Sequence, residues 1–279
     1  MKKISPVIKW SGSKRNQADK IVNMMPKEID TYYEPFVGGG SVFIKLATSS
    51  IKVNKFILSD INDDLISLWK IIVSDPVGVY QHYRTLWEEM SSIKDWDKKK
   101  KYYLNIRERF NKSKSPYDFM FIMRTTFNGM PRYNKNGVFN NPLHPNRNGI
   151  VPEKLLNIMM EWREIIQSKN VTFLNQSYEE IKTSENDVLY LDPPYAGIKG
   201  MYYGTLDNYD ALWNFLRNQK AKWLLSFDGK TTSEDYTIKI PSDIYKSHEF
   251  LENGNSSFRR LNGKSNKEYV FESLYKNYG

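Results

Sequence analysis

The run Asp192-Pro193-Pro194-Tyr195 is the place in the sequence where residue types and spacing point most directly to chemistry. It follows the apolar stretch 188–191, which predicts a buried strand. In an open α/β sheet, ligands bind beyond the carboxyl ends of the strands, so a carboxylate at this position would face a crevice. The prolines fix the backbone and present rigid carbonyl acceptors, and the tyrosine ring offers a face on which a planar base can stack.

These acceptors suit a reaction at an amine that is attached to an aromatic ring. Such an amine is a poor nucleophile because its lone pair is delocalised. Asp192 and the Pro193 carbonyl would hold the two amine hydrogens, favour a pyramidal nitrogen and so release the lone pair toward an electrophile. A turn that only ends a strand is the alternative interpretation of the same residues.

A second motif, Glu-Pro-Phe-Val-Gly-Gly-Gly at 34–40, stands between a predicted strand and a predicted helix. Gly38 and Gly40 fit the first glycines of a dinucleotide fingerprint, but Phe43 occupies the place of the third, which disfavours a pyrophosphate. Asp60 ends the next predicted strand, where an acid accepts hydrogen bonds from ribose hydroxyls. A ribose site without a pyrophosphate site indicates S-adenosylmethionine, whereas a packing turn and a helix cap are the alternative.

Two further segments combine basic and aromatic residues. Lys9-Trp10-Ser11-Gly12-Ser13-Lys14-Arg15 is either a mobile basic arm or a segment whose tryptophan packs on another part of the protein. Residues 124–134 place arginines beside aromatic rings; arginine can bond guanine, and an aromatic wedge can fill the gap that an extruded base leaves. The alternative is a solvated loop with Phe127 and Tyr133 in a small core.

The charge distribution favours a polyanionic partner. Residues 76–166 hold 16 Lys or Arg against 9 Asp or Glu and so carry most of the net charge of +9. The sequence has no cysteine, and its three histidines lack metal-ligand spacing, so we expect no metal site. We find neither a secretory leader nor an apolar run of the ~20 residues that a membrane span needs, and we expect a cytoplasmic protein without membrane contact.

The pattern of apolar residues predicts an α/β fold whose helical module is inserted between two halves of one sheet domain. The catalytic domain would comprise residues 1–75 and 167–279, and the DNA target-recognition domain would comprise residues 76–166. The inserted module would be mostly helical, with a β-hairpin around the Asn-Gly of 132–139. The expected strands are 32–36, 55–59, 171–174, 188–191, 223–227 and 269–274, and the expected helices outside the module are 41–47, 61–73 and 208–219.

Taken together and in order, the motifs resemble those of the Dam-like (D12 class, alpha group) DNA methyltransferases, which act on the N6 amine of adenine. Lys9-Trp10 with Gly12 and Lys14, the glycine motif 34–40, Ser59-Asp60-Ile61-Asn62 and Asp192–Tyr195 are similar to the family's cofactor, glycine, acidic and catalytic motifs. The likeness covers most of the chain. It implies a Rossmann-like fold, S-adenosylmethionine as methyl donor, and a flipped-out adenine in double-stranded DNA as substrate.

The resemblance also implies which residues carry each role. The catalytic residues would be Asp192, Pro193, Pro194 and Tyr195. The cofactor would be held by Trp10, Lys14, Glu34, Phe36, Gly38, Gly40, Asp60, Ile61 and Asp192. The DNA would be bound by Lys9, Arg124, Phe127, Asn128, Met130, Arg132, Asn134 and Pro142. Of these, Phe127 matches the aromatic that wedges into the DNA, and Asn128 matches a residue that contacts the orphaned partner base.

GATC is the candidate recognition site, since Lys9, Met130, Arg132 and Pro142 match positions that read it in relatives. Met130 stands where leucine is usual, and Leu-His-Pro-Asn-Arg at 143–147 replaces the expected Phe-Gly-basic-Tyr, so the sequence leaves the exact site open. A bacterial or phage-encoded enzyme, acting as a monomer or weak dimer on DNA, is expected. A cognate restriction endonuclease for the same site is a candidate partner.

Other functions share part of this pattern. Methylation at cytosine carbon 5 is excluded, because it needs an attacking thiolate and the chain has no cysteine. Methylation of the cytosine N4 amine uses the same acceptors, although its motif commonly begins with serine. A catalytically silent DNA-binding relative, or a methyltransferase acting on protein glutamine or RNA, is a further alternative; intact Asp192, Asp60 and Lys14 argue against the first, and Asn is more typical than Asp192 in the second.

Overall fold

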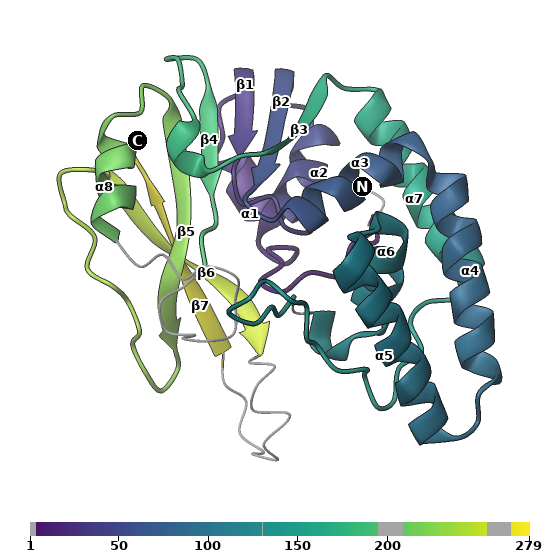
Figure 1. Ribbon diagram of the computed structural model, residues 1–279. Helices are drawn as coiled ribbons and strands as arrows, with labels where there is room; N and C mark the ends of the chain where they lie inside the picture. The colour runs from purple at the N-terminus through teal and green to yellow at the C-terminus, as the bar shows by residue number, and fades with distance from the viewer. Residues whose placement is uncertain (1–3, 130, 195–208, 256–268) are drawn as a thin grey trace.

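The computed structural model describes residues 4–129, 131–194, 209–255 and 269–279. Helices cover both faces of a central sheet, and a group of helices extends from one side of it (Figure 1). The mixed α/β fold predicted from the sequence is thereby confirmed. Two predicted site residues, Met130 and Tyr195, lie outside the described residues, as does the side chain of Asn128.

Seven strands form the sheet in the order β3-β2-β1-β4-β5-β7-β6, and β7 runs antiparallel to both of its neighbours while the other pairs are parallel. The strands are β1 (Glu28–Glu34), β2 (Lys52–Asp60), β3 (Val171–Asn175), β4 (Val188–Leu191), β5 (Lys222–Thr231), β6 (Ser247–Asn255) and β7 (Tyr269–Lys276). The chain moves outward from β1 to β3 and returns at β4, on the other side of β1. Strand order therefore reverses between β1 and β4, which is where such sheets leave a crevice for a ligand.

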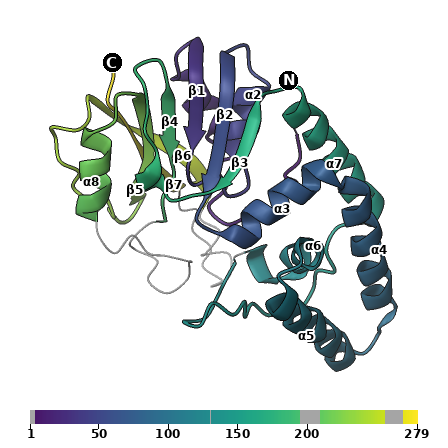
Figure 2. The same ribbon diagram turned by 45° about the horizontal axis from the view of Figure 1, so that its top comes forward.

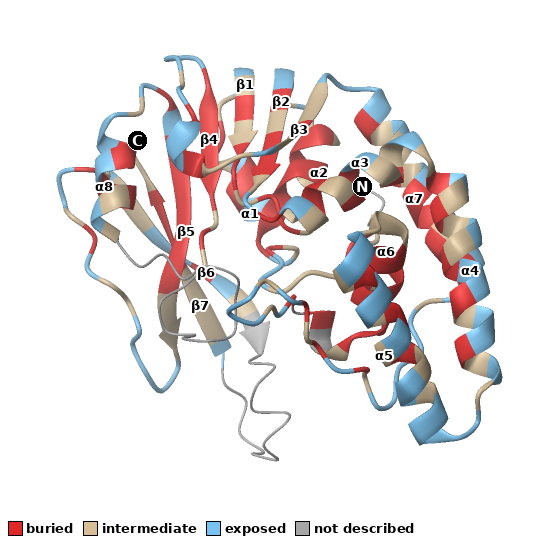
Figure 3. Ribbon diagram, in the orientation of Figure 1, coloured by how far each residue is buried: buried red, intermediate tan, exposed pale blue. Residues whose placement is uncertain are grey.

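Every residue of β4 is buried, which explains its continuous apolar sequence (Figure 3). Alternate side chains point to opposite faces: Val188 and Tyr190 belong to one apolar cluster, and Leu189 and Leu191 belong to the other. The helices that contribute to the first cluster from the sheet side are α1 (Ala18–Asn23), α2 (Ser41–Ala47), α3 (Asp63–Ser74) and α7 (Pro152–Gln167). The second cluster contains α8 (Tyr209–Arg217).

The inserted helices α4 (Pro76–Ser92), α5 (Trp96–Ser113) and α6 (Pro116–Thr125) lie away from the sheet, beyond α3 (Figure 2). Asp75 begins α4 by accepting a hydrogen bond from the Gly78 amide at 2.9 Å, with a proline in the first turn. Buried residues of these helices belong to the same apolar cluster as α2 and α3. Helix α7 connects the two parts, because its Trp162 packs against Phe43 of α2 and Trp69 of α3.

The hairpin expected at 132–139 is present in a short form. Tyr133 and Phe139 form an antiparallel bridge, and on either side of it the Asn134 amide donates to the Val138 carbonyl and the Asn140 amide to the Arg132 carbonyl, each at 2.9 Å. The side chain of Asn111 bonds both main-chain groups of Phe139, at 2.8 Å and 2.9 Å, and so ties the hairpin to α5. Strand β6 and the short helix α1 were not predicted, whereas α2 spans the predicted residues.

Candidate active site

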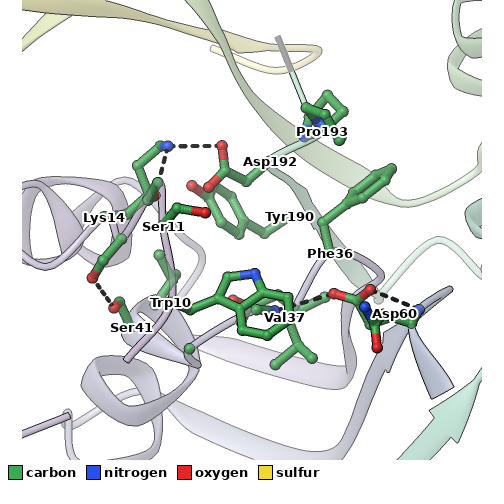
Figure 4. A pocket seen from close by; sticks show the side chains of 18 of the residues that line it. Trp10, Ser11, Lys14, Phe36, Val37, Ser41, Asp60, Tyr190, Asp192 and Pro193 are labelled. Atoms are coloured by element: carbon green, nitrogen blue, oxygen red, sulfur yellow. Dashed lines mark hydrogen bonds and ion pairs between the residues drawn. The ribbon is translucent and has the colours of Figure 1, made fainter. Parts of the chain in front are cut away.

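A pocket opens at the carboxyl ends of β1, β2 and β4, at the point where strand order reverses (Figure 4). It brings together most of the residues predicted to hold the cofactor and to act in catalysis. Those that line it are Trp10, Lys14, Glu34, Phe36, Gly38, Asp60, Ile61, Asp192, Pro193 and Pro194. Gly40 is not among the lining residues; it precedes α2 with a φ of 67°, and a Cβ there would come within 3.1 Å of Trp69 and 3.2 Å of Trp162.

The glycine turn lets an aromatic ring approach the backbone closely. Gly38 has a φ of 47°, and a Cβ on it would lie 2.9 Å from Cδ1 of Trp10. The Gly38 carbonyl accepts a hydrogen bond from Nε1 of Trp69 at 3.0 Å, which fixes the turn from below. The Trp10 ring thus packs over the turn and borders the pocket, so residues near the N-terminus pack here instead of forming a free arm.

Asp60 faces the pocket and is not a helix cap. The neighbouring Asn62 caps α3, accepting from the Leu65 amide at 2.9 Å. The Asp60 carboxylate instead accepts from the amides of Asn62 at 3.0 Å and Gly38 at 3.3 Å. Burial raises the pKa of Asp60 to about 6, although these hydrogen bonds oppose the shift. The carboxylate is therefore ionised at neutral pH and available to hydrogen-bond donors in the pocket.

Lys14 is buried between two carboxylates. Its Nζ lies 2.8 Å from Oδ1 of Asp192 and 3.4 Å from Oε2 of Glu272, and it donates to the Gly12 carbonyl at 3.2 Å. Burial alone would lower the pKa of Lys14, but the charges of Asp192 and Glu272 outweigh it and raise the pKa. The ammonium therefore stays charged and fixes one oxygen of Asp192.

Glu34, at the end of β1, lies beneath the pocket as a buried acid. The Tyr32 hydroxyl donates to its Oε2 at 2.7 Å. Burial raises the pKa of Glu34 to about 8, and the nearby Asp192 charge contributes in the same direction. At neutral pH Glu34 is therefore mostly protonated, whereas Asp60 is ionised.

Glu272 and Tyr190 complete the site without having been predicted. Glu272 also accepts from Asn253 at 2.8 Å, which ties β7 to β6 behind the lysine. Tyr190 lines the pocket, and its hydroxyl is 2.8 Å from that of Ser226 on β5. A single carboxylate inside the otherwise apolar strand 269–275 was the available signal for Glu272; nothing local distinguished Tyr190 from a core residue.

The described residues that were predicted to bind DNA do not line the pocket, and most of them lie on or after the short helix η1 (Phe127–Gly129). Three of them are exposed and form local contacts. Arg132 donates to Oδ1 of Asn140 at 3.2 Å, Asn134 accepts from the amides of the turn, and the Pro142 carbonyl accepts from the Phe127 amide at 3.1 Å. Lys9 packs its stem against Gly129, because a Cβ there would lie 2.6 Å from Lys9 Cγ.

Arg124 turns inward instead of facing solvent. Its guanidinium donates to the main-chain carbonyls of Pro6, at 2.8 Å, and of Val7. Burial lowers the pKa of Arg124 to about 10. The structure thus places this residue as a link between α6 and the segment that leads to Lys9 and Trp10, and not beside the exposed Arg132.

Among residues 4–129, 131–194, 209–255 and 269–279, no three His, Cys, Asp or Glu side chains lie together as a metal-binding group. Over the same ranges, no helix is long and apolar enough to span a membrane.

The sheet order, the antiparallel β7 and the pocket at the reversal of strand order define a Rossmann-like methyltransferase fold. Sequence comparison identifies the family: the chain belongs to the D12 class N6 adenine-specific DNA methyltransferases, whose family model matches residues 10–267. The protein is accordingly an adenine-specific DNA methyltransferase, and the family predicted from the sequence is confirmed.

Two curated relatives illustrate the range of similarity. The Type II methyltransferase M.MjaIII of Methanocaldococcus jannaschii is 28% identical over 302 aligned positions, which cover 99% of each chain. The DNA adenine methylase of Serratia marcescens is 35% identical over 202 positions, which cover 70% of this chain and 68% of that protein.

Proposed function

We propose that the protein transfers a methyl group from S-adenosylmethionine to the N6 amine of an adenine that has left the DNA stack, with GATC as the candidate site. The observation that supports this most directly is the position of Asp192. Its carboxylate follows β4, opens into the same pocket as Gly38 and Asp60, and is held by Lys14 at 2.8 Å. The methyl donor, S-adenosylmethionine, and the methyl acceptor, adenine, would therefore meet at the Asp192 carboxylate.

The charges of the pocket fit a sulfonium nucleoside better than a polyphosphate. Asp60 is positioned to accept from ribose hydroxyls, and the Trp10 ring offers an apolar face. Lys14 is neutralised by Asp192 and Glu272, so the described residues that line the pocket leave no uncompensated cation to hold a phosphate. Bound S-adenosylmethionine supplies an electrophilic sulfonium methyl group.

The residues around Asp192 account for the activation of the amine. Lys14 fixes one carboxylate oxygen, which sets the direction in which Asp192 can accept a hydrogen bond. The Pro193 carbonyl is bonded to the nitrogen of Pro194, which carries no hydrogen, so this peptide group offers the amine an acceptor and no competing donor. Two fixed acceptors stabilise a pyramidal nitrogen more than a planar one, and this difference lowers the barrier to transfer.

We infer that DNA recognition falls to residues that follow α6. We infer that Phe127 fills the gap left by adenine, that Asn128 contacts the orphaned base, and that Arg132 reads a base edge. Double-stranded DNA is the proposed partner, bound by a monomer or a weak dimer. A restriction endonuclease that cuts the same site is a second proposed partner.

Methyl transfer from tritium-labelled S-adenosylmethionine to duplex DNA, followed by nucleoside analysis, tests the proposal. We expect the label in N6-methyladenine, and a GATC duplex should be a better acceptor than one in which these bases are scrambled. Label in methylcytosine, RNA or protein would contradict the adenine reaction. Equal labelling of both duplexes would contradict GATC alone.

A further inference from the structure

Phe127, the proposed wedge, already has an aromatic partner within the protein. Its ring stacks on the imidazole of His144, with the ring centroids 5.2 Å apart and the planes inclined by 22°. Both side chains are half-buried, so the pair lies at the surface beside the exposed Arg132 loop. Offset stacking at this distance is the favourable arrangement of two aromatic rings.

The backbone holds both rings in place. An isolated bridge joins Thr126 to Leu143, immediately before each ring in the sequence. The His144 amide donates to the Thr125 carbonyl at 3.0 Å, and the Phe127 amide donates to the Pro142 carbonyl at 3.1 Å. The paired main chains therefore set the positions from which the two side chains stack.

The imidazole itself is oriented by a further hydrogen bond. Its Nδ1 accepts from the Asn146 amide at 3.0 Å, so in the neutral ring the hydrogen is on Nε2. Burial, and then the positive charges of Arg147 and Lys9, lower the pKa of His144. The ring is therefore neutral at physiological pH and presents an uncharged aromatic face to Phe127.

We propose that His144 is a positioning residue that holds Phe127 as a preformed wedge for the gap left by the flipped adenine. This inference rests on the proposed function. Residues 143–147 are where the sequence departs from the family pattern, and a glycine, expected at the place of His144, could not supply a ring. The stability of an aromatic pair corresponds to about two- to ten-fold in an equilibrium, so flipping should change by this factor.

His144→Gly tests the inference when the target adenine of a duplex is replaced by 2-aminopurine, whose fluorescence rises on leaving the stack. We expect the flipped population and the single-turnover methylation rate on ordinary DNA to fall about two- to ten-fold, with affinity for S-adenosylmethionine unchanged. His144→Phe restores a ring and should recover most of the loss. His248→Ala is the matched control, because His248 also stacks on an aromatic ring, Tyr275, at 4.2 Å, but outside this surface.

A double-mutant cycle separates positioning from a general structural role. If His144 acts through Phe127, then His144→Gly should have little further effect in a Phe127→Ala background, whereas independent roles would give additive losses. The inference would be overturned if the His144→Gly variant flipped adenine to the same extent as the wild-type protein, or if the losses in the cycle were additive. If His144→Gly lowers the melting temperature of the protein, the His144→Phe variant gives the decisive measurement. Failure of His144→Phe to recover flipping would also overturn the inference.

Failure of the inference is distinguishable from failure of the proposed function. Methylated adenine together with unchanged flipping in the variants would remove the role of His144 and leave adenine methylation in place. Absence of methylated adenine with the wild-type protein would remove both.

Discussion

The pocket and the surface around η1 differ in how their buried charges are compensated. In the pocket, Lys14 lies between Asp192 and Glu272. At the surface, the buried guanidinium of Arg124 bonds only main-chain carbonyls, and the charges of Arg124 and Arg147 act on Lys9, whose pKa is lowered by burial first and then by these neighbours. None of these three cations forms an ion pair with a described residue.

This difference shows which site is complete before its ligand arrives. A buried charge without a counter-charge is costly, and the pocket avoids that cost with its own carboxylates. Near η1, the half-buried ammonium of Lys9 has no carboxylate partner among the described residues, and we expect a phosphate of bound DNA to supply the counter-charge. Each variant below tests one side of this comparison.

Asp192→Ala should have the largest effect, because it removes the acceptor and leaves Lys14 with Glu272 alone. We expect single-turnover methyl transfer to fall by at least about 10²–10³-fold, as for loss of a catalytic hydrogen-bonding group, while DNA affinity is retained. Rapid-quench measurement of labelled DNA checks the rate. Glu272→Gln is the comparison, since it keeps Asp192; an equal loss there would assign the effect to disruption of the lysine site.

Asp60→Asn should weaken the binding of S-adenosylmethionine by roughly ten- to hundred-fold at pH 8, because hydrogen bonds to an ionised group are lost. The pKa of about 6 sets the pH dependence. The ionised form accepts the ribose hydroxyls, so wild-type affinity should fall as the pH drops from 7 through 6. Calorimetric titration across this range checks it, and the Asn variant should show no such fall.

Arg132→Ala should relax base preference at one position of the site by about 1–3 kcal/mol if the exposed guanidinium reads guanine. Competition between duplexes that differ at single positions measures this discrimination. If DNA affinity were instead weakened equally for all sequences, Arg132 would be a phosphate contact and would not read a base.

Arg147→Gln should produce the smallest change, and mainly in its dependence on salt. If Arg147 neutralises one phosphate, the slope of log affinity against log salt should become shallower by about 0.9. Fluorescence anisotropy at several salt concentrations measures the slope. Lys246→Gln, at an exposed lysine beside β6, is the control, and the same change in both variants would indicate a general charge effect.

Local motifs were predictable from the sequence, and contacts between distant segments were not. The strand before Asp192, the glycine turn and the acid after β2 are each defined by neighbours in the chain, and the structure brings them to one pocket. Glu272 acquires its contact only because β7 inserts beside β5. The inward direction of Arg124 depends on the segment at Pro6, 118 residues away, and no local pattern records that contact.

Because Lys9 and Trp10 are adjacent in the sequence, one N-terminal segment contacts two separate regions of the molecule. Lys9 packs on Gly129, in the segment that we propose binds DNA, and the next residue, Trp10, packs on the glycine turn of the pocket. The cofactor pocket and the segment proposed to bind DNA thus contact the same short stretch of backbone, which Arg124 of α6 holds by hydrogen bonds. If bound cofactor makes this stretch more rigid and thereby strengthens DNA binding, then bound DNA must strengthen cofactor binding by the same factor.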